Sequence, residues 1–209
     1  MKHQGAHKDI IEQVPPDYYQ KGVRKNLLQR KWHTGKLDAV LSEIDFEPKK
    51  ILDVGCASGW FLSRLAHTYP HAKCYGIDMY GAAITYGQKK YPKMKLKISD
   101  AHDIPYDDNM FDLIVCTEVL EHVEKPQKVL YEIKRLLTKD GKAIIALDSG
   151  SLLFSVVWFL WRLGQGNVWN HSHLHTFNVK KLGNLIKKTG LKTISKKRFN
   201  IGMAMVFSV

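Results

Sequence analysis

The sequence predicts an α/β protein with a doubly wound, mostly parallel β-sheet that ends in an antiparallel hairpin. Five short apolar segments rich in β-forming residues alternate with segments of helical periodicity, which is the pattern of a parallel sheet with crossover helices. Polar residues follow four of these predicted strands, at the sheet edge where such folds bind ligands. The last two predicted strands are separated only by Asn200-Ile201-Gly202, which is too short for a parallel crossover and predicts a hairpin.

The composition is that of an ordinary globular chain of one domain. Its 209 residues suffice for a sizeable core, and 44% of them are hydrophobic while 25% are charged. Cys56, Cys74 and Cys116 have no C-x-x-C spacing, so neither a zinc ribbon nor a disulfide framework is indicated, and a reduced, cytoplasmic setting is expected. The stretch from Met1 to Gln13 lacks the apolar core of a signal peptide.

Residues 1–44 are expected to precede the main domain, residues 45–209. Residues 1–16 have the composition of a flexible lead-in that stops at Pro15-Pro16, and residues 17–43 have mainly helical periodicity. A helix at this place could cover one end of a binding site.

The most informative stretch is residues 51–65. Its apolar start predicts a buried strand, and Gly55 and Gly59 then permit a tight turn and close approach of a ligand to the backbone. Apolar residues recur at helical spacing from Phe61 to Tyr69, so the turn opens a helix. Because N–H groups at a helix start lack intrahelical partners, we expect a ligand with acceptor oxygens, as in nucleotide sites.

The spacing of the glycines indicates which class of nucleotide ligand the loop would bind. The G-x-G-x-x-G fingerprint of dinucleotide sites is absent, and Trp60 follows Gly59 where a phosphate-binding P-loop has lysine. The chain has instead Asp53-x-Gly55-x-x-x-Gly59, with an acid at the end of the strand. A carboxylate there favours a ligand with an ammonium group over a pyrophosphate.

The next two units repeat this arrangement. Residues 74–77 predict a second strand closed by Asp78, which follows Gly59 by 19 residues, close to the distance at which nucleotide-binding units place a ribose-binding carboxylate. Asp78 could alternatively cap the following helix, residues 82–90. Residues 95–98 predict a third strand, and Asp100 lies just beyond it.

The remaining elements complete the sheet. Residues 111–115 predict a fourth strand followed by Thr117, and a helix begins near Pro126 with an apolar face. Asp140-Gly141 is expected to turn the chain into a fifth strand, residues 143–147. A helix over residues 179–189 should end at Gly190, ahead of the hairpin strands 191–199 and 203–209.

The Asp53-x-Gly55-x-x-x-Gly59 pattern resembles motif I of the class I S-adenosylmethionine-dependent methyltransferases, although Ala57 stands where that family often has another glycine. Residues 100–106, 111–115 and 119–123 are similar to the small-molecule branch that includes quinone-biosynthesis methyltransferases. The resemblance implies a seven-stranded, Rossmann-like sheet with one reversed strand. It also implies S-adenosylmethionine as the methyl donor, S-adenosylhomocysteine as the product and no required metal.

By this resemblance, the cofactor lies along the ends of the first four strands. Its methionine moiety would meet the loop after the first strand, with an acid near the amino group, and its ribose would meet the acid after the second. The adenine would lie between the residues that follow the second and third strands, and the sulfonium near the fourth. The implied cofactor residues are Asp53, Gly55, Cys56, Gly59, Asp78, Met79, Asp100, Ala101 and Thr117.

Residues 149–177 or thereabouts are expected to form an insertion on the acceptor side. Residues 152–161 have Ser155 as their only polar member, and this run is too short to span a bilayer, which needs ~20 residues. The run is consistent with packing on the sheet and equally with insertion into a membrane interface, where Trp158 and Trp161 would act as anchors.

Histidines follow this apolar run. His171, His173 and His175 would point to one side of an extended chain. No flanking acid or cysteine supports a zinc site, so we expect one of them, His173 before His175, to contact the acceptor or take a proton from it. His122, after the fourth strand, is the other candidate catalytic residue.

Charge is distributed unevenly along the chain. The net charge is +12, from 32 basic and 20 acidic residues, and after Asp148 there are nine basic residues and no acidic one. This asymmetry favours an anionic partner, either a membrane surface or nucleic acid. A solvent-exposed helix face with a basic edge strand would have the same composition.

The sequence therefore predicts a cytoplasmic methyltransferase for a small-molecule or lipid-linked acceptor, with peripheral attachment to a membrane left open. An RNA methyltransferase is the alternative suggested by the basic C-terminal part. Against it, the Asn/Asp-Pro-Pro-Tyr/Phe signature of base-amine methylation is absent where Thr117-Glu118 stands. A cofactor-binding module without catalysis, docked on membranes or partners, is the third interpretation. The acceptor atom and the oligomeric state are left open.

Overall fold

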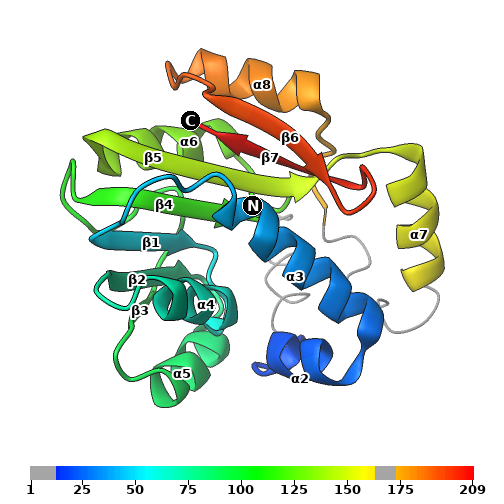
Figure 1. The fold of residues 1–209 in the computed structure, drawn as a ribbon, viewed down its shortest axis with the longest axis horizontal. Coiled ribbons are helices and arrows are strands. Elements are labelled where there is room, and N and C mark those ends of the chain that lie inside the picture. The colour runs from blue at the N-terminus through cyan, green and yellow to red at the C-terminus, as the bar shows by residue number, and fades with distance from the viewer. Residues whose placement is uncertain (1–12, 163–172) are drawn as a thin grey trace.

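The computed structural model describes residues 13–162 and 173–209, and its centre is a seven-stranded sheet (Figure 1). The strands lie in the order β3-β2-β1-β4-β5-β7-β6. All neighbouring pairs from β3 to β5 are parallel, whereas β7 runs antiparallel to both β5 and β6 and is the reversed strand of the sheet. The predicted doubly wound, mostly parallel sheet with a C-terminal antiparallel hairpin is confirmed.

The strands alternate with short helices along the chain. The strands are β1 (Lys50–Val54), β2 (Lys73–Asp78), β3 (Lys95–Ile98), β4 (Phe111–Thr117), β5 (Leu137–Asp148), β6 (Ser195–Phe199) and β7 (Ala204–Ser208). The helices are α2 (Tyr18–Lys25), α3 (Leu27–Leu41), α4 (Trp60–Thr68), α5 (Gly81–Lys90), α6 (Pro126–Leu136), α7 (Leu152–Arg162) and α8 (Val179–Lys188).

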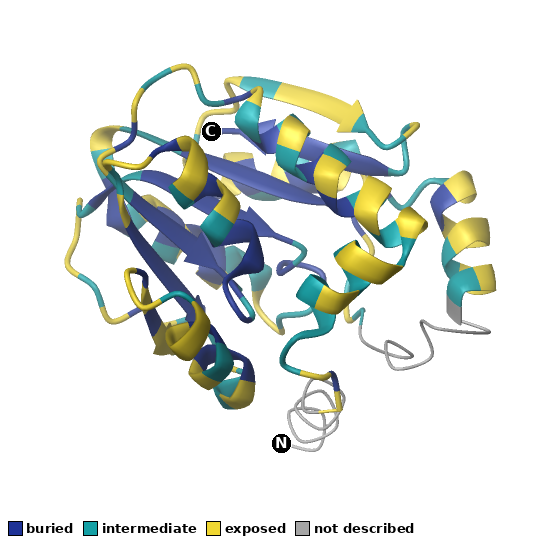
Figure 2. Cartoon of the chain, turned by 60° about the horizontal axis from the view of Figure 1, so that its bottom comes forward, coloured by how far each residue is buried: buried dark blue, intermediate teal, exposed yellow. Residues whose placement is uncertain are grey.

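Different helices cover the two faces of the sheet. Leu52 and Val54 of β1 lie in one buried cluster with residues of α6 and α8, whereas Ile51 lies in a second cluster with residues of α3, α4 and α5. The central strands are buried, and the helices are exposed on their outer sides (Figure 2). The near-continuous apolar sequences of these strands are a consequence of burial on both faces.

The winding of the sheet reverses between β1 and β4. β1 pairs with β2 on one side and with β4 on the other, so the later strands are added outward in both directions. The loops that follow the carboxyl ends of these strands therefore border a common crevice. The residues predicted to bind the cofactor lie along this edge.

The predicted N-terminal helix is divided at Asn26 into α2 and α3. The side chain of Asn26 accepts hydrogen bonds from the backbone N–H groups of Leu28 and Gln29, at 2.9 and 3.0 Å, and so caps α3. Val14 belongs to the predicted flexible lead-in but is held in the fold, whereas residues 1–12 lie outside the described residues. Val14 is already buried, and its carbonyl accepts a hydrogen bond of 2.8 Å from the Tyr80 hydroxyl.

The predicted turn at Asp140-Gly141 is wrong. β5 already begins at Leu137, which pairs with Phe111 at the start of β4. The register then shifts, so that Leu113 pairs with Lys142 and the residues between Leu137 and Lys142 have no partner in β4. The turn-forming dipeptide is therefore an irregularity within a longer strand.

The C-terminal hairpin and the apolar run also differ in extent from the expectation. β6 begins at Ser195 rather than Leu191, because its partner β7 ends opposite it at Ser208. The apolar run forms α7, which is 11 residues long. Within residues 13–162 and 173–209, no helix combines the length and the apolar character needed to cross a membrane.

Candidate active site

The loop between β1 and α4 has positive φ angles of 75° at Gly55, 47° at Ala57 and 76° at Gly59. A Cβ atom on Gly55 would lie 2.3 Å from Cγ2 of Val119, so both the space and the backbone conformation require glycine there. Ala57 adopts the left-handed region in spite of its side chain. The absence of a further glycine at that position therefore leaves the turn intact.

Several backbone N–H groups of this loop already have acceptors within the protein. Gly55 and Cys56 donate to the carbonyl of Ile77 at 2.8 and 2.9 Å, and Ala57 donates to Asp78 Oδ2 at 2.8 Å. The N–H groups of these three residues are therefore already paired within the protein. The expectation of unpaired N–H groups concerned the start of α4, which begins at Trp60, and it stays a prediction. Carbonyl oxygens are what such a loop can still offer, and they suit an ammonium group better than a phosphate.

Asp78 lies at the end of β2, and each of its carboxylate oxygens accepts one backbone hydrogen bond. Oδ2 accepts from Ala57 and Oδ1 from Tyr80, both at 2.8 Å. Burial raises the pKa of Asp78, and these hydrogen bonds act in the opposite direction. A carboxylate oxygen has two lone pairs, so Asp78 can still accept from a pair of hydroxyls.

A cavity of about 1130 Å³ brings most of the predicted site residues together. Its volume is above the ~300–1,000 Å³ usual for a single ligand site, so it has room for a cofactor and an acceptor together. The predicted catalytic residues that line it are His122 and His173. The predicted cofactor residues that line it are Gly55, Asp78, Met79, Asp100, Ala101 and Thr117.

The other predicted cofactor residues, Asp53, Cys56 and Gly59, do not line this cavity. Asp53 is 1% exposed, and neither of its carboxylate oxygens has a hydrogen-bond partner among the described residues. Burial raises the pKa of Asp53 to about 8, with Lys36 opposing the shift and Asp78 adding to it. Cys56 is buried as well, and Gly59 is the residue before α4. Asp53 thus lies beneath the loop rather than in the cavity.

Met79 and Asp100 follow β2 and β3 at the same edge of the sheet. Met79 is 56% exposed and borders the cavity. Asp100 Oδ1 accepts hydrogen bonds from the backbone N–H and the ring Nδ1 of His102, at 2.8 and 2.6 Å. Burial alone would raise the pKa of Asp100, but these bonds hold it below its usual value. The second oxygen, Oδ2, is then the one to receive a donor from a ligand.

Aromatic side chains form the other end of the cavity. Trp158 of α7 stacks on His173 with ring centroids 5.2 Å apart and on Phe154 with centroids 5.7 Å apart. The ring of Phe154 in turn lies beside that of Trp32 of α3, with the two ring centroids 6.2 Å apart. One side of α7 therefore belongs to the cavity wall. Its other side is open to solvent, through the exposed residues Leu152, Leu153, Val156, Phe159 and Leu160.

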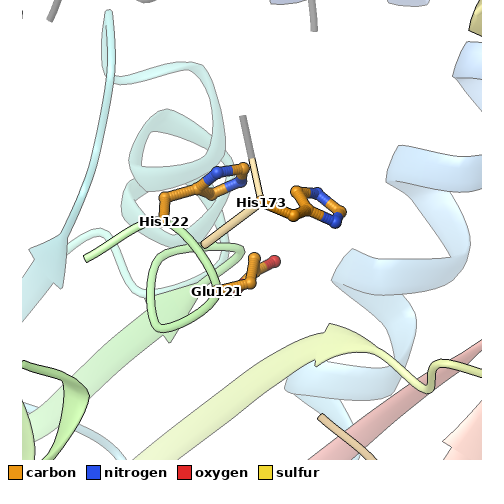
Figure 3. A group of neighbouring side chains, drawn as sticks. All are labelled: Glu121, His122 and His173. Carbon is orange, nitrogen blue, oxygen red and sulfur yellow. The ribbon is translucent and has the colours of Figure 1, made fainter. Parts of the chain in front are cut away.

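Acids and histidines gather beside this aromatic wall. Glu121, His122 and His173 each place one side-chain oxygen or nitrogen within 4.8 Å of the others (Figure 3). Asp148, at the end of β5, has its Oδ2 3.8 Å from His173 Nδ1. Burial raises the pKa of Asp148 to about 6 and that of Glu121 well above its usual range. A buried acid with a pKa of about 6 therefore lies beside His173 at this end of the cavity.

Backbone hydrogen bonds fix the position of the histidine segment. The N–H groups of Leu174 and His175 both donate to the carbonyl of Glu121, at 2.8 and 3.1 Å. His173 and His175 do not share a site: His173 lines the large cavity, whereas His175 borders a separate hollow of about 280 Å³. His171 lies outside the described residues.

The sequence analysis expected that an N-terminal helix could cover one end of the site, but it did not identify the residues of α3 that reach this end of the cavity. Trp32 Nε1 donates to Glu118 Oε1 at 3.0 Å, and Lys36 Nζ lies 3.4 Å from Glu118 Oε2. His33 is buried nearby, and burial lowers its pKa to about 3. Residues four apart share a helix face, so the spacing of Trp32, Lys36 and Val40 could have indicated a face turned toward the protein.

Comparison with known proteins agrees with this arrangement. Residues 52–145 match a family model described as a methyltransferase domain. The chain is 24% identical over 226 residues to a demethylmenaquinone methyltransferase of Bacillus mycoides, covering 97% of this chain and 94% of that protein. It is 28% identical over 138 residues to a malonyl-[acyl-carrier protein] O-methyltransferase of Legionella pneumophila, covering 65% of this chain but only 44% of that protein.

A solved structure has the same fold over nearly the whole chain. It is a SAM-dependent methyltransferase of Thermotoga maritima, described as a possible histamine N-methyltransferase, with a TM-score of 0.74 at 18% identity. The match covers 97% of this chain and 98% of that one.

The sheet order, the glycine loop at its switch point and the family match together define a Rossmann-like methyltransferase of class I. The chain is an S-adenosylmethionine-dependent methyltransferase of this class. The relatives are named for acceptors as different as demethylmenaquinone and malonyl-[acyl-carrier protein], so the acceptor has to be argued from the site itself.

Proposed function

We propose that the chain transfers the methyl group of S-adenosylmethionine to a small, largely apolar acceptor, either free or carrying a lipid tail. The observation that carries this proposal is the continuity of the cavity from Asp78 and Asp100 to the aromatic wall of Trp32, Phe154 and Trp158. A flat acceptor would stack against this wall, and its binding would exclude water. The full-length likeness to an enzyme named for demethylmenaquinone supports an acceptor of this kind.

The residues after β2 and β3 fit the nucleoside part of the cofactor. The remaining lone pairs of Asp78 suit the two ribose hydroxyls, as a charge-assisted pair of hydrogen bonds. Asp100 Oδ2 would accept from the adenine amino group, with the Ala101 N–H at a ring nitrogen. Met79 would pack its side chain on the adenine ring.

The loop after β1 fits the methionine part. Backbone carbonyls at Gly55 and Cys56 would accept from the ammonium group, and that positive charge would favour the ionised form of Asp53 beneath them. Gly59 would keep the start of α4 close to the ligand, and Thr117 would lie under the sulfonium. When bound, the cofactor supplies a methyl group activated by positive sulfur, so the protein has to position the acceptor and exclude water.

Histidines at the acceptor end would handle the acceptor's proton. A base is needed only when the acceptor must lose a proton to attack, as a hydroxyl or a protonated amine would. His173 remains the first candidate because it lies between Trp158 and Asp148 and lines the cavity. The ring of His122 lies edge-on to the ring of His173, with the two centroids 4.8 Å apart. His175, which borders the other hollow, is the weakest of the three.

We also propose that the cavity mouth rests on an anionic membrane surface, from which a lipid-linked acceptor would enter. Leu27 and Leu28 at the junction of α2 and α3 are 62% and 68% exposed, and Phe159 and Leu160 of α7 are 54% and 61% exposed. Leu28 also lines the cavity. Acidic lipid head groups would meet the exposed basic residues of α2 and α3, Arg24, Lys25, Arg30 and Lys31.

The basic residues of the C-terminal part lie elsewhere. α8, with four exposed lysines, is at the opposite end of the molecule from α2 (Figure 1). In β6, Lys197 is paired with Glu43 at 2.6 Å. These residues are the surface that an RNA substrate would use, so the two proposals place the anionic partner on different parts of the chain.

The function is tested by measuring S-adenosylhomocysteine formation with short-chain demethylated quinols and, separately, with total RNA. We expect turnover with a quinol-type acceptor. Trp158→Ala should raise the KM for that acceptor at least about tenfold, because a stacked ring is lost, while the Kd for S-adenosylmethionine stays unchanged. Turnover with RNA and none with any apolar acceptor would replace this proposal by the RNA alternative.

A further inference from the structure

Two side chains of the loop after β4 and one of the segment after α7 converge at the acceptor end of the cavity. Glu121 and His122 are neighbours in the chain, and His173 lies beside them (Figure 3). One potential ligand atom from each lies within 4.8 Å of the other two. Ligands of a tetrahedral cation, at about 2.0–2.2 Å from it, are about 3.4 Å apart, so closing the cluster on a cation needs only a shift on the order of 1 Å.

The carboxylate of Glu121 is the observation that points to a ligand. Glu121 is 1% exposed, and its Oε2 has no hydrogen-bond partner in the part of the chain that the structure describes. A buried carboxylate oxygen without a partner is unfavourable, and the carboxylates of Glu118 and Asp148 interact unfavourably with it. A cation at Oε2 would supply the missing partner and would offset the negative charge of Glu121 and of its neighbours Glu118 and Asp148.

Lys36 does not remove this need. It lies 3.4 Å from Glu118 Oε2 and serves that carboxylate. Glu121 and Asp148 are the two acids that remain, and His173 lies beside both of them. The two positive charges of a divalent cation therefore balance the two remaining acids, whereas a single lysine would not.

The backbone holds the three side chains in place before any ligand arrives. The Glu121 carbonyl accepts from the two residues that follow His173, which ties the two segments together. The His173 ring is stacked on Trp158 at an interplanar angle of 14°, and Asp148 faces its Nδ1. Carboxylates placed beside an imidazole in this way orient metal-ligating histidines.

We propose that Glu121, His122 and His173 bind a divalent transition-metal cation such as Zn²⁺ at the acceptor end of the cavity. Two imidazoles and one carboxylate favour such a cation over Mg²⁺ or Ca²⁺, which prefer oxygen ligands. Three protein ligands leave a coordination position open to the cavity, where an acceptor oxygen could bind and lose its proton more easily. The use to which the cation is put rests on the proposed function, but its binding does not.

The chelator-treated full-length protein is titrated with Zn²⁺ alone, in competition with a chromophoric zinc indicator. We expect one tight equivalent in the wild type, and at least about a tenfold loss of affinity in His122→Ala, His173→Ala and Glu121→Gln. His175→Ala is the matched control: it changes the same segment two residues away from the cluster and should bind Zn²⁺ like the wild type. Each variant is first checked for S-adenosylmethionine binding, which shows that it is folded.

A second measurement does not depend on variants. Co²⁺ added to the wild type should produce the visible absorption of a four-coordinate nitrogen–oxygen site, and Zn²⁺ should abolish it. The proposal is overturned when the wild type binds no stoichiometric Zn²⁺, or when His122→Ala and His173→Ala bind it as tightly as the wild type. Zinc binding without methyl transfer to any apolar acceptor would contradict the proposed function alone, and transfer without zinc binding would contradict this inference alone.

Discussion

Asp78 Oδ2 accepts a hydrogen bond of 2.8 Å from the backbone N–H of Ala57, so the acid predicted to bind the ribose also holds the loop after β1. Ala57 has a positive φ of 47°, which is uncommon for a residue with a side chain. The bond connects the ends of two neighbouring strands at the switch point of the sheet. The ribose end and the methionine end of the proposed cofactor site are therefore coupled through one carboxylate.

The first prediction concerns this carboxylate. Asp78→Ala should raise the Kd for S-adenosylmethionine at least about tenfold, because hydrogen bonds to a charged group contribute about 1.5–3 kcal/mol each. Isothermal titration calorimetry measures the effect. Asp78→Asn retains an acceptor oxygen and the side-chain shape, so it separates loss of charge from loss of the loop contact. Equal affinities of the wild type and Asp78→Ala would show that the ribose is bound elsewhere.

The second prediction concerns pH and Asp53. Its pKa is about 8 in the folded chain and ~3.9 in the unfolded chain, so the folded state keeps a proton that the unfolded state releases. The stabilisation from this proton is fully present below about pH 4 and is lost as the pH rises through about 8. Asp53→Asn cannot lose a proton and should flatten this part of the profile.

Urea unfolding of both proteins between pH 5 and 8 measures the difference. The wild type should lose up to about 1.4 kcal/mol of unfolding free energy per pH unit relative to Asp53→Asn. Parallel profiles would mean that Asp53 is ionised throughout this range, with a partner that the folded chain supplies.

The third prediction concerns the histidines. His173→Ala should lower turnover at least about tenfold while the Kd for S-adenosylmethionine and the Tm stay near the wild-type values, because His173 lines the acceptor end of the cavity. His122→Ala should act in the same direction, and His175→Ala should have the smallest effect. Normal turnover in all three variants would place the acceptor site elsewhere.

The fourth prediction concerns the membrane. Binding to vesicles should require acidic lipid and fall with salt. The double variant Phe159→Ser and Leu160→Ser should weaken it, because these two side chains are exposed on α7. Trp158 is not the right probe, since its ring is stacked between Phe154 and His173.

Ile194→Ser is the matched control for this test: Ile194 is 65% exposed but precedes β6, away from the cavity mouth. The same loss in the control and in the α7 variant would indicate a general loss of hydrophobicity. Binding that persists in both would contradict a role of α7 in membrane contact.

The sheet could be predicted from the sequence because its signals are local. Burial on both faces makes the central strands continuously apolar, and the ends of the first two strands are marked by Asp53, Gly55 and Asp78. The reversed strand could be predicted because the link Asn200–Gly202 is too short to connect two parallel strands. Boundaries were wrong where pairing rather than composition decides them, as at Leu137, which is drawn into β5 by its partner Phe111.

The acceptor end could be predicted only in part, because it is built from segments far apart in the chain. His173 was singled out by alternation with His171 and His175, but the structure separates it from His175 and joins it to Glu121 and His122. No local pattern connects Trp32 with Glu118, which are 86 residues apart. Such contacts depend on where α3 crosses the end of the sheet.

The central claim is methyl transfer to an apolar acceptor, and one measurement tests it most directly. The protein is incubated with S-adenosylmethionine labelled in its methyl group, together with a mixture of cellular lipid extract and total RNA, and the label is followed after phase separation. The account predicts enzyme-dependent label in the organic phase, with S-adenosylhomocysteine formed in equal amount. Label confined to RNA, or no transfer to either fraction while the cofactor binds, would contradict it.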